Sequence, residues 1–172
     1  MNILDHIRKS GQKIPLSKAV IHTVIITCLG IVIGVLIKLF DIYTTNLGNI
    51  FSQVSVWFFL CTLISIYSST AMRAAANVFC FCIGMLLAYY TTAEMTASIY
   101  SHSIAYGWAV FALLSPAMGF SVWYAKGKSW ISKIISIGII IATLLTAIIL
   151  FDKIRISDIL FAVLTGFVLF KK

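Results

Sequence analysis

Apolar residues occur in six long runs separated by short polar or charged segments. A transmembrane helix needs about 20 apolar residues to cross about 30 Å of hydrocarbon. The runs therefore predict six spans, with limits near 19–40, 50–69, 74–92, 104–125, 131–151 and 156–170. The last run covers only roughly 22 Å at about 1.5 Å per residue. It would need snorkelling lysines or a locally thinner bilayer to span fully, and the sequence leaves that open.

The form of these runs favours helices over a membrane β-barrel. Barrel strands alternate apolar and polar residues over about ten positions, whereas these runs are continuous. Only a helix satisfies every backbone amide inside such a run. We therefore predict an all-α, polytopic membrane helix bundle with one transmembrane domain over residues 19–170. Residues 1–18 form a basic segment, within which 4–13 is either an amphipathic helix on the cytoplasmic leaflet or a disordered tail.

The distribution of charge predicts the orientation of the bundle. The chain has 13 Lys and Arg against 5 Asp and Glu, a net charge of +8. With both termini in the cytoplasm, ten of the 13 basic residues lie inside and four of the 5 acids lie outside. The positive-inside rule favours this arrangement over its reverse. The basic inner side is also expected to contact anionic lipids.

Composition narrows the function classes. The chain is 61% hydrophobic and 10% charged, against about 45–50% and about 25% in soluble domains. For the chain as a whole, this composition excludes a soluble enzyme, a nucleic-acid-binding domain and a disordered tail. Signatures such as HExxH, GxSxG and the P-loop are absent, so we expect no enzyme, cofactor or metal site. The cysteines have no metal or disulfide spacing and are interpreted as packing residues.

Small and polar residues mark the faces on which the first and third spans would meet protein. Helices in lipid associate through small side chains and hydrogen bonds. In the first span such residues recur at steps of three and four and include a GxxxG motif. The predicted packing residues of the two spans are Thr23, Thr27, Gly30, Gly34, Asn77 and Gly84. A solute path lined by hydroxyl groups is the alternative interpretation.

The same face of the first span carries two ionisable residues towards its outer end. An ionisable group inside a span is a functional hypothesis by default. Lys38 and Asp41 are spaced for an i,i+3 contact. They are either a local interfacial pair with a snorkelling lysine or part of an outward-facing vestibule. The residues predicted to line that vestibule are Lys38, Asp41, Tyr89, Tyr90, Glu94, Asp152 and Asp158. The tyrosines are alternatively interfacial anchors.

Two stretches in the middle of the chain carry a resemblance. One runs from Tyr67 through Arg73 and Asn77 to residues 89–90, and the other covers residues 115–128. Together they resemble a family of small, uncharacterised multi-spanning membrane proteins found mainly in Gram-positive bacteria. The resemblance implies a bacterial cytoplasmic membrane and carries over no catalytic residue. Six short spans are also similar in architecture to the substrate-binding subunits of energy-coupling vitamin transporters, an analogy that does not establish function.

Two functions fit these expectations. The first is a transport component that binds a solute in the outer vestibule and works with a membrane-protein partner or as a homo-oligomer. The second is a non-enzymatic scaffold or accessory subunit of a larger complex. The scaffold is motivated by the GxxxG motif and by the basic loop at residues 126–133.

Overall fold

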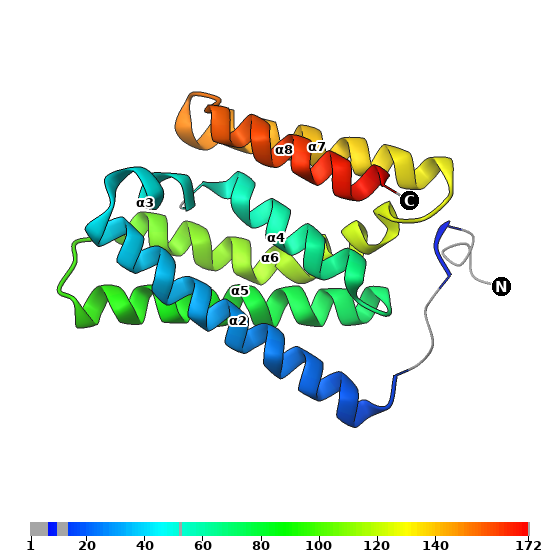
Figure 1. Ribbon diagram of the computed structural model, residues 1–172, viewed down its shortest axis with the longest axis horizontal. Helices are drawn as coiled ribbons and strands as arrows, with labels where there is room; N and C mark the ends of the chain where they lie inside the picture. The colour runs from blue at the N-terminus through cyan, green and yellow to red at the C-terminus, as the bar shows by residue number, and fades with distance from the viewer. Residues whose placement is uncertain (1–6, 10–13, 52, 172) are drawn as a thin grey trace.

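The protein is a bundle of helices (Figure 1). The computed structural model describes residues 7–9, 14–51 and 53–171, and all regular structure in these ranges is helical. The helices are α2 (Leu16–Tyr43), α3 (Thr45–Phe51), α4 (Val54–Tyr67), α5 (Ala71–Met95), α6 (His102–Ala125), α7 (Trp130–Phe151) and α8 (Ile156–Phe170). The predicted all-α class is confirmed. Helices α2, α5, α6 and α7 are long and apolar enough to cross a membrane, whereas α4 and α8 are shorter apolar helices.

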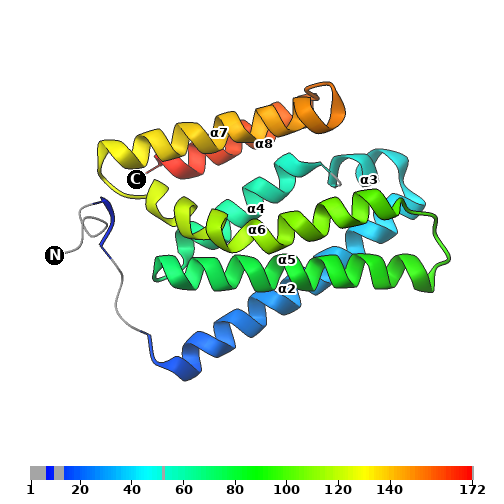
Figure 2. The ribbon, with the colours of Figure 1, turned by 180° about the vertical axis from the view of Figure 1, so that it is seen from behind.

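The long helices run back and forth along one direction (Figures 1 and 2). Leaving the short α3 aside, each helix runs roughly opposite to the one before it. The loops therefore gather at two ends of the bundle. We call the end with α3 and the loops at 96–101 and 152–155 the α3 end. We call the other end, where both chain termini lie, the terminal end.

Glycines bring α2 and α5 into close contact. A Cβ added at Gly30 would lie 2.5 Å from the carbonyl oxygen of Phe81. One added at Gly34 would lie closer still to the carbonyl oxygen of Met85. Both clashes involve backbone atoms, so neither position accepts a larger residue without moving a helix. The GxxxG motif thus faces α5, as small residues at membrane-helix interfaces commonly do.

The other predicted packing residues lie at the same interface. A Cβ added at Gly84 would lie 3.0 Å from the carbonyl oxygen of Thr27. The hydroxyl of Thr23 donates to Asn77 Oδ1 at 2.7 Å, and Asn77 Nδ2 donates to the hydroxyl of Ser68 at 3.0 Å. The polar side chains of Thr23 and Asn77 are therefore hydrogen-bonded within the chain, which removes the cost of burying them unpaired.

The second apolar run differs from its prediction. Instead of one helix over 50–69, α3 ends at Phe51 and α4 begins at Val54. Gln53 between them has an extended backbone and is buried, and its side-chain oxygen accepts a hydrogen bond from Ser157 at 2.6 Å. This polar contact with α8 interrupts the run, and α4 keeps 14 residues, or about 21 Å.

The N-terminal segment is described only at residues 7–9, so most of the predicted helix at 4–13 lies outside the described ranges. Arg8 nevertheless connects two helix ends. Its guanidinium donates to the carbonyl oxygens of Trp123 at 2.7 Å and Ile66 at 2.9 Å, and it lies 4.2 Å from the centre of the Trp123 ring. These carbonyls belong to the last turns of α6 and α4, where helical partners are missing.

Candidate binding cavity at the α3 end

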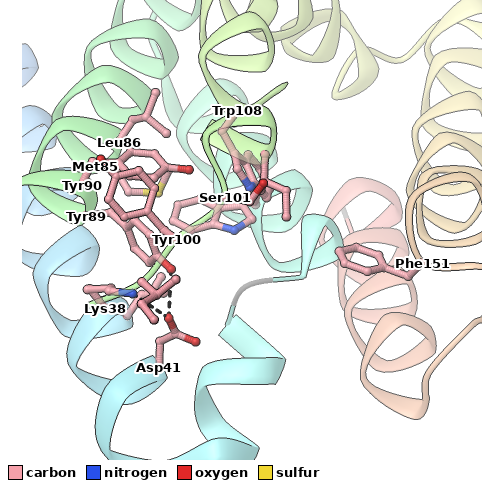
Figure 3. Close-up of a pocket in the computed structure, with 14 residues that line it drawn as sticks. Lys38, Asp41, Met85, Leu86, Tyr89, Tyr90, Tyr100, Ser101, Trp108 and Phe151 are labelled. Atoms are coloured by element: carbon pink, nitrogen blue, oxygen red, sulfur yellow. Dashed lines mark hydrogen bonds and ion pairs between the residues drawn. The ribbon is translucent and has the colours of Figure 1, made fainter. Parts of the chain in front are cut away.

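A cavity of about 280 Å³ opens at the α3 end, between α2, α4, α5, α6, the last residue of α7 and the loop that precedes α6 (Figure 3). Its volume is just below the range of about 300–1,000 Å³ of typical small-molecule sites. Aromatic rings form much of its lining. They belong to Trp57, Tyr89, Tyr90, Tyr100, Trp108 and Phe151. The cavity is therefore mostly apolar with a few polar groups, the usual make-up of a ligand site.

The polar part of the cavity is an ion pair on α2. The side chain of Lys38 is only 1% exposed, and its Nζ lies 2.9 Å from Asp41 Oδ2. The carboxylate itself is 40% exposed. The contact expected from the i,i+3 spacing is present. Because a buried ammonium is costly without a partner, the contact with Asp41 offsets part of the cost of burying Lys38 in an apolar wall.

Tyr89 completes this arrangement from the facing helix. Its hydroxyl donates to Asp41 Oδ2 at 3.1 Å, and its ring centre lies 5.1 Å from Lys38 Nζ. Both donors thus bind the same carboxylate oxygen. Among the residues that the structure describes, no donor binds the other oxygen, Oδ1, and Lys38 Nζ has no second acceptor. Asp41 Oδ1 therefore remains as a hydrogen-bond acceptor at the cavity, and Lys38 Nζ retains N–H groups that can donate.

The tyrosines form a contiguous cluster around one side of the cavity. The ring centres of Tyr89 and Tyr90 are 5.1 Å apart, and those of Tyr90 and Tyr100 are 5.0 Å apart. Tyr100 lies in the loop before α6 and donates its hydroxyl to Glu94. This hydrogen bond, together with the charge of the carboxylate, raises the pKa of the Tyr100 phenol. Glu94 therefore positions a lining residue without lining the cavity itself.

Two acids predicted for the vestibule lie elsewhere. Asp158 is buried in the first turn of α8, where it accepts from the Ser55 hydroxyl at 2.6 Å and from the backbone N–H of Arg155 at 2.9 Å. Carboxylates are favoured there because helix N-terminal N–H groups lack helical partners. Asp152 is exposed in a left-handed conformation (φ 53°) at the end of α7. The structure does not bring either acid to this cavity: Asp152 ends α7, and Asp158 caps α8 and binds Ser55 of α4.

The structure therefore brings together four of the seven predicted vestibule residues, Lys38, Asp41, Tyr89 and Tyr90. It adds aromatic residues that the sequence reasoning missed. Trp57 and Trp108 have ring centres 6.1 Å apart, and each lies within two turns of the helix end that faces the α3 end. Their matching depth, near the first turns of two spans that run in the same direction, was the signal that could have identified them.

Away from the cavity, two thiols meet in the core. Cys61 Sγ and Cys82 Sγ are 3.6 Å apart, and both residues are buried. Within the described ranges, no three His, Cys, Asp or Glu side chains are grouped so as to hold a metal ion. The polar side chains in the cavity lining are Lys38, Asp41, the three tyrosines and Ser101, with the indole N–H groups of Trp57 and Trp108.

No family model, curated protein or solved structure matches the chain. Its class follows from the fold alone: in the part of the chain that the structure describes, all regular structure is helical and four helices are long and apolar enough to cross a membrane. The resemblance to the family from Gram-positive bacteria stays a prediction.

Proposed function

We propose that the protein is a small transport component that binds a solute in the cavity at the α3 end. The observation that carries this proposal is a buried, paired lysine in the wall of an aromatic-lined cavity. Ionisable groups inside membrane-spanning segments commonly mark substrate and ion pathways. A lysine needed only to anchor the helix would extend its ammonium to water, whereas Lys38 is turned inward against Asp41 and Tyr89.

The proposal includes six spans, although two helices are short. Nine of the 14 residues of α4 are buried. A helix surrounded by protein need not match the full hydrocarbon thickness by itself, because its ends meet other helices instead of lipid. Helix α8, at about 22 Å, would rely on local thinning of the bilayer. By contrast, α2 exposes Val20, Val24 and Leu29, as a lipid-facing helix does.

The charges at the two ends support an outward-facing cavity. The terminal end carries Arg8, Lys126, Lys128 and Lys171, whereas the α3 end carries four of the five acids of the chain. The positive-inside rule then assigns the terminal end to the cytoplasm, where its basic residues would contact anionic lipids. We place the protein in a bacterial cytoplasmic membrane on the strength of the resemblance described above.

The experiment that tests this function is solute binding by the purified protein in lipid nanodiscs. Tryptophan fluorescence reports on the cavity because Trp57 and Trp108 line it. We expect a saturable fluorescence change with one solute class from a nutrient panel, and loss of that change in Lys38→Met. The matched control is Lys153→Met, which removes an exposed lysine from the same end of the bundle. A panel without any saturable signal would refute the binding function.

The scaffold remains the second candidate, and the structure leaves it less support. The GxxxG motif is occupied by α5 of the same chain, so it is not free to bind another protein. The basic segment at residues 126–133 still favours an accessory role, since Lys128 in the loop after α6 and Lys133 in the first turn of α7 are exposed. Co-purification of a stable membrane partner that is lost on Lys128→Ser and Lys133→Ser would favour the scaffold.

A further inference from the structure

We infer that the solute is a small zwitterion: a molecule with an ammonium group and a carboxylate at one end of a flat, apolar body. This inference rests on the proposed binding function and names its substrate class. It follows from three properties of the cavity, namely its charge balance, its unused hydrogen-bonding capacity and the shape of its walls.

The charge balance comes from the ion pair. Lys38 and Asp41 have opposite charges, and together they are neutral. A simple anion would leave the cavity with one uncompensated negative charge, and a simple amine with one positive charge. Uncompensated charges are expensive in an apolar site. A molecule that is neutral overall but carries both charges avoids this penalty.

The unused hydrogen-bonding capacity matches those two charges. A lysine ammonium has three N–H donors, and among the described residues only Asp41 accepts one from Lys38. The carboxylate of Asp41 receives both of its donors on Oδ2, which leaves Oδ1 as an acceptor. A ligand carboxylate can therefore accept from Lys38 while the ligand ammonium donates to Asp41 Oδ1. The Lys38 ammonium, the ligand carboxylate, the ligand ammonium and the Asp41 carboxylate would then alternate in charge.

The aromatic side chains that line the cavity indicate that the uncharged part of the ligand is flat and apolar. Trp57 and Trp108 meet edge to face in the lining of the cavity, and Tyr89, Tyr90 and Tyr100 form a second aromatic cluster in it. Aromatic rings attract other flat rings in offset or edge-to-face arrangements. They also attract cations, so the tyrosines would assist the ammonium group. The volume of about 280 Å³ restricts the ligand to a small molecule.

The test uses four probes that differ in one feature each. L-Phenylalanine has both charges and a ring, 2-phenylethylamine lacks the carboxylate, 3-phenylpropionate lacks the ammonium, and glycine lacks the ring. Binding to the wild-type protein in nanodiscs is measured by titration calorimetry. We expect L-phenylalanine to bind at least roughly tenfold more tightly than each of the other three. Equal affinities, or a preference for the amine or the acid, would overturn the inference.

Two variants test which side chain binds which charge of the ligand. Lys38→Met should invert the preference towards 2-phenylethylamine, because it leaves Asp41 as the only charge. Asp41→Asn should invert it towards 3-phenylpropionate, because it leaves Lys38. Asp152→Asn and Lys153→Met, which change charges in the α7–α8 turn outside the cavity lining, should keep the wild-type order. Failure of the two inversions in folded variants would contradict the assigned contacts.

The outcomes separate this inference from the proposed function. Saturable binding of the amine alone or the acid alone by the wild-type protein would retain a binding cavity and reject the zwitterion. Absence of saturable binding by all four probes would reject the zwitterion, and the wider nutrient panel then decides the function. The ranking of the probes needs only the wild-type protein, so a variant that fails to fold does not affect it.

Discussion

The two ends of the bundle use basic side chains in opposite ways. At the terminal end, Arg8 donates to carbonyl oxygens in the last turns of α4 and α6, and Lys126 donates to the carbonyl oxygens of Val168 and Lys171. These cations satisfy helix ends that lack partners. At the α3 end, Lys38 faces a carboxylate and a cavity and retains unused donors. The difference indicates that Arg8 and Lys126 complete helix ends, whereas Lys38 is available to a ligand.

The largest effect should come from the glycine contact that holds Lys38 in place. Gly34→Ala puts a methyl group against the carbonyl oxygen of Met85, and we expect the free energy of unfolding to fall by about 3 kcal/mol, at the upper end for overpacking. Unfolding in detergent by heat or denaturant measures the change. Gly138→Ala is the matched control, because nothing lies within 4 Å of its added Cβ. A control as unstable as Gly34→Ala would contradict the account.

The second effect concerns the ion pair. Asp41→Ala leaves the buried ammonium of Lys38 without its acceptor, and we expect a loss of about 2 kcal/mol in the free energy of unfolding. Lys38→Met removes the cation and leaves a carboxylate that water already reaches, so it should destabilise less. The same unfolding measurement compares the two variants. Equal losses would show that the lysine is not buried as described.

A smaller effect is expected at the terminal end. Arg8→Ala removes two hydrogen bonds and a ring contact, but water can replace the donors at a helix end. We expect a loss of about 1 kcal/mol in stability and unchanged affinity for any solute that the cavity binds. Parallel unfolding and binding measurements test both statements. Weakened binding would mean that the two ends are coupled.

The smallest effect depends on pH. Because the Glu94 contact raises the pKa of Tyr100, the stability from this hydrogen bond is fully present below the ordinary phenol value of about 10. It is lost as the pH rises through the raised pKa. The melting temperature of the wild type should therefore exceed that of Tyr100→Phe slightly at pH 8, and this gap should close in strong alkali. A gap that widens with pH would contradict the assigned contact.

The sequence predicted the helices and the depth of most site residues, but not their lateral positions. Continuous apolar runs indicate helices reliably because only a helix satisfies every backbone amide within a single run in lipid. The depth of Lys38, Tyr89 and Asp158 followed from their places near the ends of the runs. Which helices meet at the cavity depends on packing, and this is why Asp158 and Asp152, at comparable depth, lie outside it.

The small-residue face of α2 shows the same limit: the sequence predicts the face but not the helix that packs against it. The steps of three and four identified the small side of α2, including Gly30 and Gly34. They did not identify α5 as the helix that covers this side, because a small face accepts any helix with a matching surface. The break before α4 was also missed. It depends on the contact of Gln53 with Ser157, which lie far apart in the sequence.

The most direct test of the account is the accessibility of the cavity from one side of the membrane. In a version with the four native cysteines changed to alanine, Ser101→Cys places a thiol in the cavity wall and Lys128→Cys places one at the terminal end. We predict that a membrane-impermeant maleimide labels the first in intact cells, that L-phenylalanine slows this labelling, and that the second reacts only after permeabilisation. Labelling of Lys128→Cys alone in intact cells would contradict the outward-facing cavity.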